Sequence, residues 1–175
     1  MRRTTGVTTA LSFILILCVT MLAGLAAPAG APARTTLSTL EREVLAGVNA
    51  QRSARGLAPL RAQTDLTCAA RAHSRSMAHG SFLSHDSAGG ASFGGRLLSH
   101  GYRRDGYSAW RVGENIAGAR VGSLAATPQG VVLLWMGSSA HRSVILGGAF
   151  RDAGIGLHSA GGRRYFTLDL GGRRR

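Results

Sequence analysis

Apolar side chains recur at steps of three and four residues in two segments of the chain, a spacing that places them on one face of an α-helix. The first segment runs from Thr35 to Arg55, and Gly56 is suited to end it. Its apolar positions are Leu37, Leu40, Val44, Leu45 and Val48. The second segment, "TDLTCAARAHSRSMAHG", opens on the capping residues Thr64 and Asp65 and closes on Gly80. We therefore predict two helices, over residues 35–55 and 64–80.

Shorter patterns follow along the rest of the chain. A short helix is expected over 93–99, and "TPQGVVLLWMG" predicts a helix with Thr127 as its cap and Pro128 at its first position. The segment "WRVGENIAGA" is interpreted as extended, and two further strands are predicted on either side of a turn at 160–162. Helices interleaved with a few strands indicate an α+β domain in which helices cover a small antiparallel sheet.

The first 33 residues have the composition of a signal peptide. Arg2 and Arg3 precede the apolar run "LSFILILCVTMLAGLAA", and "APAGAPA" supplies small residues before a cleavage site. We expect export and cleavage after Ala33, with Ala29 as the second choice, and the alternative is an uncleaved membrane anchor. Residues 34–175 would then form one secreted domain with no membrane span after cleavage.

Every basic residue of the chain is an arginine. Residues 34–175 contain 19 of the 21 arginines and all 8 acidic residues, a formal charge of +11. This charge favours anionic partners such as a cell-wall polymer or lipid headgroups. No nucleic-acid-binding motif accompanies it, so no specific nucleic acid is expected. Cys68 is the only cysteine after residue 33, which excludes an internal disulfide in a domain that we expect to be monomeric.

Three ionisable residues stand at the boundaries of predicted elements, where side chains are readily presented to a groove. They are His85 in "FLSHDS", Glu114 in "GENIA" and His141 in "SSAHRS". Glu114 lies among small and apolar residues, where an unpaired carboxylate would be costly. Two histidines and a carboxylate can hold a divalent cation such as zinc, or can form a hydrogen-bonded network without metal. Their separations of 29 and 27 residues match no local metal-binding motif.

At these residues the sequence resembles the CAP superfamily of cysteine-rich secretory, antigen 5 and pathogenesis-related proteins, and most closely its secreted bacterial members. The matching pieces occur in family order and span about residues 40–170. They are "VLAGVNAQRSARGLAPL", "FLSHDS", "GENIAGA", "VVLLWMGSSAHRSVIL" and "FRDAGIGL". The resemblance implies an α-β-α sandwich around an antiparallel sheet.

The resemblance also implies a cleft lined by two histidines and acidic residues, in some members occupied by a divalent cation. His85, Glu114 and His141 match three of these positions. A second glutamate, which the family carries three residues after the helix tryptophan, is replaced here by Ser138. Asp86 is the candidate to take its place.

Three functions are consistent with these observations. The leading hypothesis is an extracellular binding module whose cleft at His85, Glu114 and His141 takes a divalent cation or a small ligand, with wall polymers, lipids and small hydrophobic molecules as possible partners. The alternative is a metal-assisted hydrolase, a peptidase at the cell envelope, in which the same three residues are the catalytic candidates and Glu114 is the general base. A third hypothesis is an adhesin held to anionic envelopes by arginine alone.

Overall fold

The computed structural model describes Met1 and residues 36–175. Apart from Met1, the predicted signal peptide lies outside the described residues. Residues 36–175 belong to one compact unit. None of the described helices is long and apolar enough to cross a membrane.

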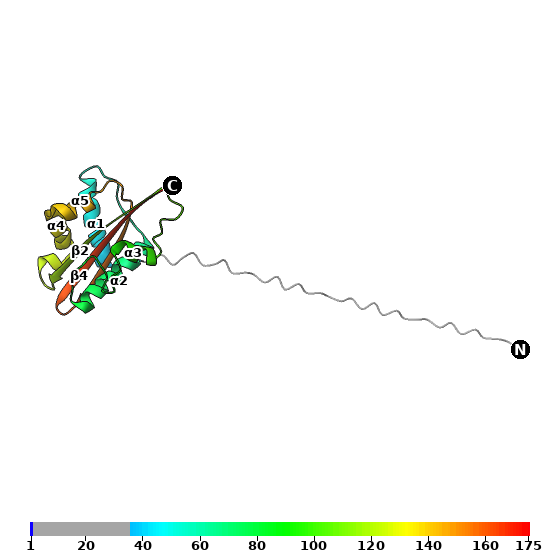
Figure 1. Cartoon of the computed structure of the whole chain (residues 1–175), viewed down its shortest axis with the longest axis horizontal. Coiled ribbons are helices and arrows are strands. Elements are labelled where there is room, and N and C mark those ends of the chain that lie inside the picture. Colours follow the sequence, from blue (N-terminus) through cyan, green and yellow to red (C-terminus); the bar gives the residue numbers. More distant parts are fainter. Residues whose placement is uncertain (2–35) are drawn as a thin grey trace. The chain divides into compact units, whose positions relative to one another are not determined.

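The described domain consists of five α-helices, one 3₁₀ turn and four strands (Figure 1). In chain order they are α1 (Thr39–Ser53), β1 (Arg61–Ala62), α2 (Thr64–Gly80), α3 (Phe93–Ser99), β2 (Ala109–Arg120), η1 (Leu124–Ala126), α4 (Pro128–Gly137), α5 (Ser139–Ile145), β3 (Asp152–Ala160) and β4 (Arg163–Arg174). The predicted helices and strands are confirmed, whereas β1 and the separate helix α5 were not predicted.

Two predicted helix starts differ in detail from the structure. Helix α1 begins at Thr39, four residues later than predicted, because Ser38 and Glu41 form a capping box. Helix α2 is capped by the side chain of Gln63, which accepts a hydrogen bond from the backbone N–H of Leu66. In both cases a side chain satisfies N–H groups that the first helical turn leaves without partners.

The four strands form one sheet in the order β1-β3-β4-β2. The three long strands are antiparallel, as predicted, and the two-residue β1 adds a parallel pair with β3, so the sheet is mixed. β2 is an edge strand, and β4 lies between β2 and β3. Glu114 on β2 is paired directly with Asp169 on β4.

Helix α2 covers one face of the sheet at very short range. A Cβ atom on Gly154 would lie 2.1 Å from the backbone carbon of Leu66, and one on Gly156 would lie 2.2 Å from that of Ala70. The hydroxyl of Ser74 donates to the carbonyl of Gly156 at 2.9 Å. The two glycines therefore allow α2 to lie directly on β3.

Helices α1, α4 and α5 supply the second layer, on the opposite face. Their apolar side chains meet those of β3 and β4 in the largest core cluster, which includes Val48, Trp135 and Phe166. The indole N–H of Trp135 also donates to the carbonyl of Ile116 at 3.1 Å. The domain is thus an α-β-α sandwich, as the resemblance to the CAP superfamily implies.

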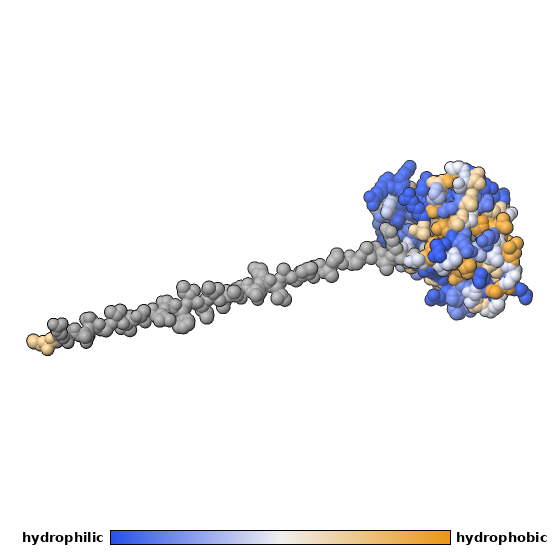
Figure 2. Space-filling view, turned by 180° about the vertical axis from the view of Figure 1, so that it is seen from behind, coloured by the Kyte–Doolittle hydropathy of each residue, from blue (hydrophilic) through white to orange (hydrophobic). Residues whose placement is uncertain are grey.

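The outer surface of this second layer keeps some apolar side chains in solvent. Leu124 on η1 and Leu133 and Leu134 on α4 are 69%, 60% and 49% exposed. Figure 2 shows apolar patches among hydrophilic residues on the face that it presents.

Candidate functional site

Glu114 is buried in the edge strand β2 and is paired with two nitrogen-bearing side chains. The Nδ1 atom of His85 lies 2.8 Å from its Oε1 atom, and the Nη2 group of Arg96 contacts Oε2. The side chain of Glu114 is 1% exposed, against 52% for His85 and 6% for Arg96. A buried carboxylate needs such partners to remain ionised.

Arg96 holds the loop that carries His85 against β2. It projects from the short helix α3, and its Nη1 group donates to the carbonyl of His85 at 3.1 Å and to the hydroxyl of Ser87 at 3.0 Å. The cation beside Glu114 is therefore an arginine of the chain itself. Nothing in the sequence pattern indicates this role, because Arg96 is one of 21 arginines and matches none of the motifs described above.

His141 is not bonded to Glu114 in the structure. It lies inside α5, rather than after a helix end as predicted, and its carbonyl accepts a hydrogen bond from the Asn115 side chain at 3.0 Å. Consecutive strand residues point to opposite faces of a sheet, so Asn115 ties α5 to the face away from Glu114. Burial, followed by the charge of nearby His85, lowers the pKa of His141. His141 thus approaches the site from the other side of the edge strand, near His85.

The second acidic residue of the site is Asp169, on β4. Its carboxyl is fully buried opposite Glu114, and the two carboxyls can share a hydrogen bond only when one of them carries a proton. Burial raises the pKa of Asp169, the charge of Glu114 raises it further, and Arg96 opposes both. Asp86, the expected substitute, is exposed, and its carboxylate has no hydrogen bond or ion pair within residues 36–175.

We predict that Asp169→Asn becomes less destabilising as the pH rises. The folded protein retains the Asp169 proton at pH values where the unfolded chain, with the usual pKa near 3.8, has lost it. The contribution of Asp169 to stability is therefore fully present below pH 3.8 and falls above it, by up to about 1.4 kcal/mol per pH unit until the folded pKa is reached. Urea unfolding at pH 4, 5.5 and 7 measures the difference in the free energy of unfolding between the variant and the wild-type protein. A difference that stays constant would contradict the prediction, and Asp105→Asn, at an exposed carboxylate, is the control.

A pocket of about 280 Å³ lies on the α2 and α3 side of this network. Its lining includes Arg96, Ser87, His100 and His73. His73 is 1% exposed, and its Nε2 atom is 2.8 Å from the carbonyl oxygen of Ser84. Burial, with a smaller effect from the charge of Arg96, lowers the pKa of His73. Arg96 therefore connects the pocket directly to Glu114.

The side chains gathered here do not fit a bound metal ion. Within residues 36–175 no three histidine, cysteine or acidic side chains are placed so that they could share a metal ion. One oxygen of Glu114 faces the guanidinium of Arg96, a positive charge that repels a second cation. The structure bonds His85 to Glu114 and gives the His141 side chain no bond to either residue, so the three predicted ligands do not share one set of contacts among the described residues.

Comparison with known proteins places the chain in a family. The sequence model of the CAP, or Cysteine-rich secretory protein, family matches residues 45–170. The chain is 30% identical over 129 residues to the uncharacterized protein YkwD of Bacillus subtilis, a match that covers 74% of this chain and 46% of YkwD. The protein therefore belongs to the CAP family, and it spans about half the length of that relative.

Solved structures agree with this assignment. An extracellular protein containing an SCP domain from Bacillus anthracis superposes with a TM-score of 0.59 at 26% identity, over 77% of this chain and 40% of that one. An outer surface protein of Borrelia burgdorferi shares the fold, with a TM-score of 0.63 at 16% identity over 76% of this chain and 92% of that one. These relatives are described as extracellular or outer-surface proteins.

Proposed function

We propose that the protein is exported and acts outside the cell as a CAP-domain binding module, with His85 and the adjoining pocket as its ligand site. The observation that carries the proposal is that both carboxylate oxygens of Glu114 are already engaged, one by His85 and the other by Arg96. The network is thereby fixed before a ligand arrives, and such preorganisation favours binding.

The ligand would meet the outer half of the His85 ring. Because Nδ1 faces Glu114, Nε2 is the ring nitrogen left for a ligand, on a side chain that is 52% exposed. Neutral imidazole with its proton on Nδ1 accepts a hydrogen bond at Nε2, and protonated imidazole donates one. The site suits a ligand with hydroxyl or anionic groups, which also match Arg96, Ser87 and His100 along the pocket.

A hydrolase would need a different arrangement of the same residues. A general base must be within reach of the proton that it removes, and it needs a free oxygen to accept that proton. Glu114 is 1% exposed, and its oxygens face His85 and Arg96. We therefore place the peptidase hypothesis second.

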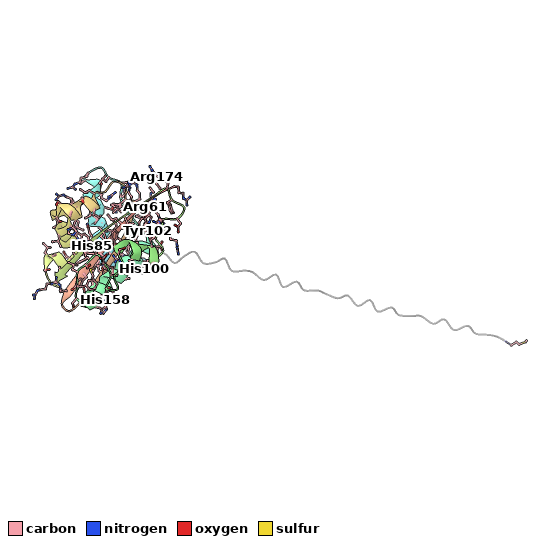
Figure 3. All side chains as sticks on the ribbon, viewed as in Figure 1. Arg61, His85, His100, Tyr102, His158 and Arg174 are labelled. Carbon is pink, nitrogen blue, oxygen red and sulfur yellow. The ribbon has the colours of Figure 1, made fainter. Side chains whose placement is uncertain are left out.

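Two double variants test this proposal. We expect His85→Ala/His141→Ala to reduce co-sedimentation with purified peptidoglycan sacculi at least fivefold, because the exposed imidazole of His85 and the half-buried one of His141 near it are lost. The matched control is His79→Ala/His158→Ala, which removes two histidines whose rings lie 5.0 Å apart, with His158 near the end of β3 (Figure 3). Equal sedimentation of both variants and wild type would contradict the proposed site.

The same proteins decide between binding and hydrolysis. We expect no cleavage of casein or of wall peptides by the wild-type protein. Cleavage that is lost in His85→Ala/His141→Ala and kept in the control would support the hydrolase instead. One equivalent of zinc, released on acidification, would also argue for the alternative, because protonated imidazoles lose their metal.

A further inference from the structure

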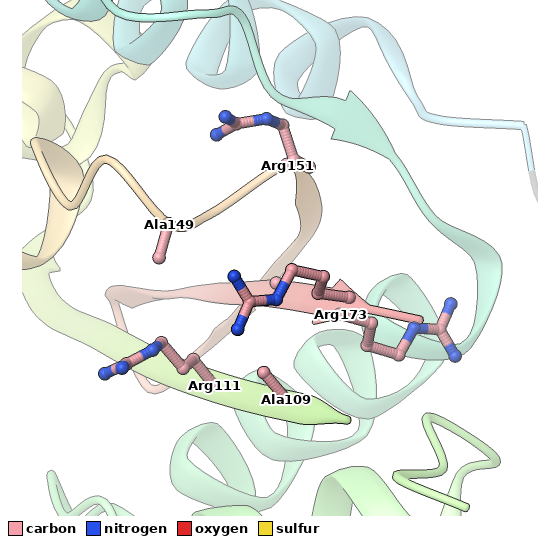
Figure 4. A pocket seen from close by; sticks show the side chains of 7 residues that line it. Ala109, Arg111, Ala149, Arg151 and Arg173 are labelled. Atoms are coloured by element: carbon pink, nitrogen blue, oxygen red, sulfur yellow. The ribbon is translucent and has the colours of Figure 1, made fainter. Parts of the chain in front are cut away.

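A second charged site, separate from His85 and Glu114, lies where β2 begins and β4 ends. A pocket of about 380 Å³ there is walled by small residues and by four arginines, with no acidic side chain in its lining (Figure 4). The arginines are Arg111 on β2, Arg151 just before β3, and Arg173 and Arg174 on β4. Three separate segments of the chain thus bring positive charge to one hollow.

Arg111 and Arg174 are available to a ligand. The strand pairing sets Arg174 opposite Ala109 and Arg111 opposite Gly172, so both arginine side chains lie on the same face of the sheet. Both residues are exposed, and neither guanidinium forms a hydrogen bond or ion pair within the described domain. Gly172 allows the segment at Ala149 to lie directly against β4 beside the pocket, because a Cβ atom there would lie 2.2 Å from the carbonyl oxygen of Ala149.

Arg151 adds a third positive charge to the pocket, and the buried guanidinium of Arg52 lies close to it. Its Nη1 group donates to the carbonyl of Phe150 at 2.7 Å, and the Nη2 group of Arg52 donates to the same oxygen at 3.3 Å. Arg52 is fully buried, and its other hydrogen bonds also go to carbonyl oxygens. Burial and the charge of Arg151 lower the pKa of Arg52. No carboxylate of the described residues pairs with either arginine, so their charge is not neutralised within the domain.

Arg173 is held in place beside the pocket. Its guanidinium lies 4.2 Å from the ring centroid of Tyr102 and 4.8 Å from that of Tyr107. Asp152 lies 3.9 Å away and is also bonded to the Tyr102 hydroxyl at 2.8 Å. Among the described residues this is the only ion pair that any of the four pocket arginines makes, and it leaves a clear excess of positive charge.

We propose that this pocket binds a phosphate group of an extended anion. Guanidinium groups present pairs of N–H donors that match phosphate oxygens, and several of them around one hollow suit a group with two or more charged oxygens. The proposal is independent of the ligand site at His85. It assigns a location to the anionic partner that the net charge of the chain indicates, and the shared chemistry is a phosphate or phosphodiester.

The test compares two pairs of substitutions that remove the same charge. Arg111→Gln/Arg174→Gln removes the two guanidinium groups of the pocket that form neither a hydrogen bond nor an ion pair within the described domain. Arg75→Gln/Arg120→Gln removes two exposed arginines elsewhere, Arg75 on α2 and Arg120 at the opposite end of β2. We expect the pocket variant to bind inorganic polyphosphate at least tenfold more weakly than wild type, and the control variant to stay within twofold.

Amide NMR shifts locate the binding. Inorganic phosphate, compared with chloride at equal ionic strength, is expected to shift the amides of Arg111, Gly172 and Arg174 in a saturable way. Equal losses of polyphosphate affinity in the two variants would overturn the proposal, because binding would then be diffuse. The absence of saturable shifts in the wild-type protein would overturn it as well.

Vesicles distinguish the two sources of phosphate. Co-sedimentation with phosphatidylglycerol vesicles, and not with phosphatidylcholine vesicles, that weakens in the pocket variant would identify a lipid headgroup. Polyphosphate binding without vesicle binding would identify a soluble or wall-bound phosphate polymer. Either result supports a phosphate site at these arginines.

Discussion

Replacing Gly154 with alanine is expected to lower the free energy of unfolding by about 3 kcal/mol or more, the upper end of the usual cost of overpacking. The added Cβ atom would lie 2.1 Å from the backbone carbon of Leu66 and 2.3 Å from its carbonyl oxygen. These are backbone atoms inside α2, so no side-chain rotation can make room. Helix α2 must shift from the sheet or β3 must bend. Urea unfolding followed by circular dichroism measures the change.

The control is an alanine at a glycine with open space around it. Gly137 ends α4 and is exposed, and a Cβ atom added there would have no heavy atom within 4 Å beyond its own helix and chain neighbours. Its replacement is expected to leave stability unchanged or to raise it by up to about 1 kcal/mol, because alanine favours the helix. If Gly154→Ala and Gly137→Ala had similar stabilities, the close approach of α2 to β3 would not be a determinant of the fold.

The sequence predicts those elements whose signals are local. The cap at Thr127, the glycine turn at 160–162 and the spacing of apolar residues in α2 each depend on a few neighbouring positions, and the structure confirms these elements. The two-residue strand β1 and the division between α4 and α5 carry no comparable signal. β1 exists because β3 offers a free edge, which is a tertiary condition.

The candidate site is predicted only in part for the same reason. The motifs in the sequence select Glu114 and His85, and in the structure the Nδ1 atom of His85 lies 2.8 Å from the Oε1 atom of Glu114. Arg96 and Asp169 reach the site through the placement of α3 and the register of β4, and neither can be read from spacing. Asp169 alternates with apolar residues along a strand that helices cover on both sides, so its burial depends on the complete sandwich.

Glu114→Gln is expected to lower the free energy of unfolding by about 3 to 5 kcal/mol, the usual cost of removing one partner of a buried ion pair. The isosteric amide keeps the volume and removes the charge that faces Arg96, which is 6% exposed. The guanidinium would then be buried without its counter-ion. Urea unfolding at pH 7 tests this, and Asp86→Asn, at an exposed carboxylate in the same region, is expected to change stability by less than about 0.5 kcal/mol.

A second substitution separates the loss of an ion pair from a simple packing defect. Burial, the largest cause of the raised pKa of Asp169, remains once Glu114 is neutral, but the charge of Glu114 no longer adds to it while Arg96 still lowers it. Asp169 therefore ionises more readily beside Arg96 and replaces part of the lost interaction. Asp169→Asn should therefore destabilise the Glu114→Gln variant more than it destabilises the wild-type protein at pH 7. A packing defect would instead make the two losses additive, and additivity within about 0.3 kcal/mol would show that Arg96 does not couple the two carboxyls.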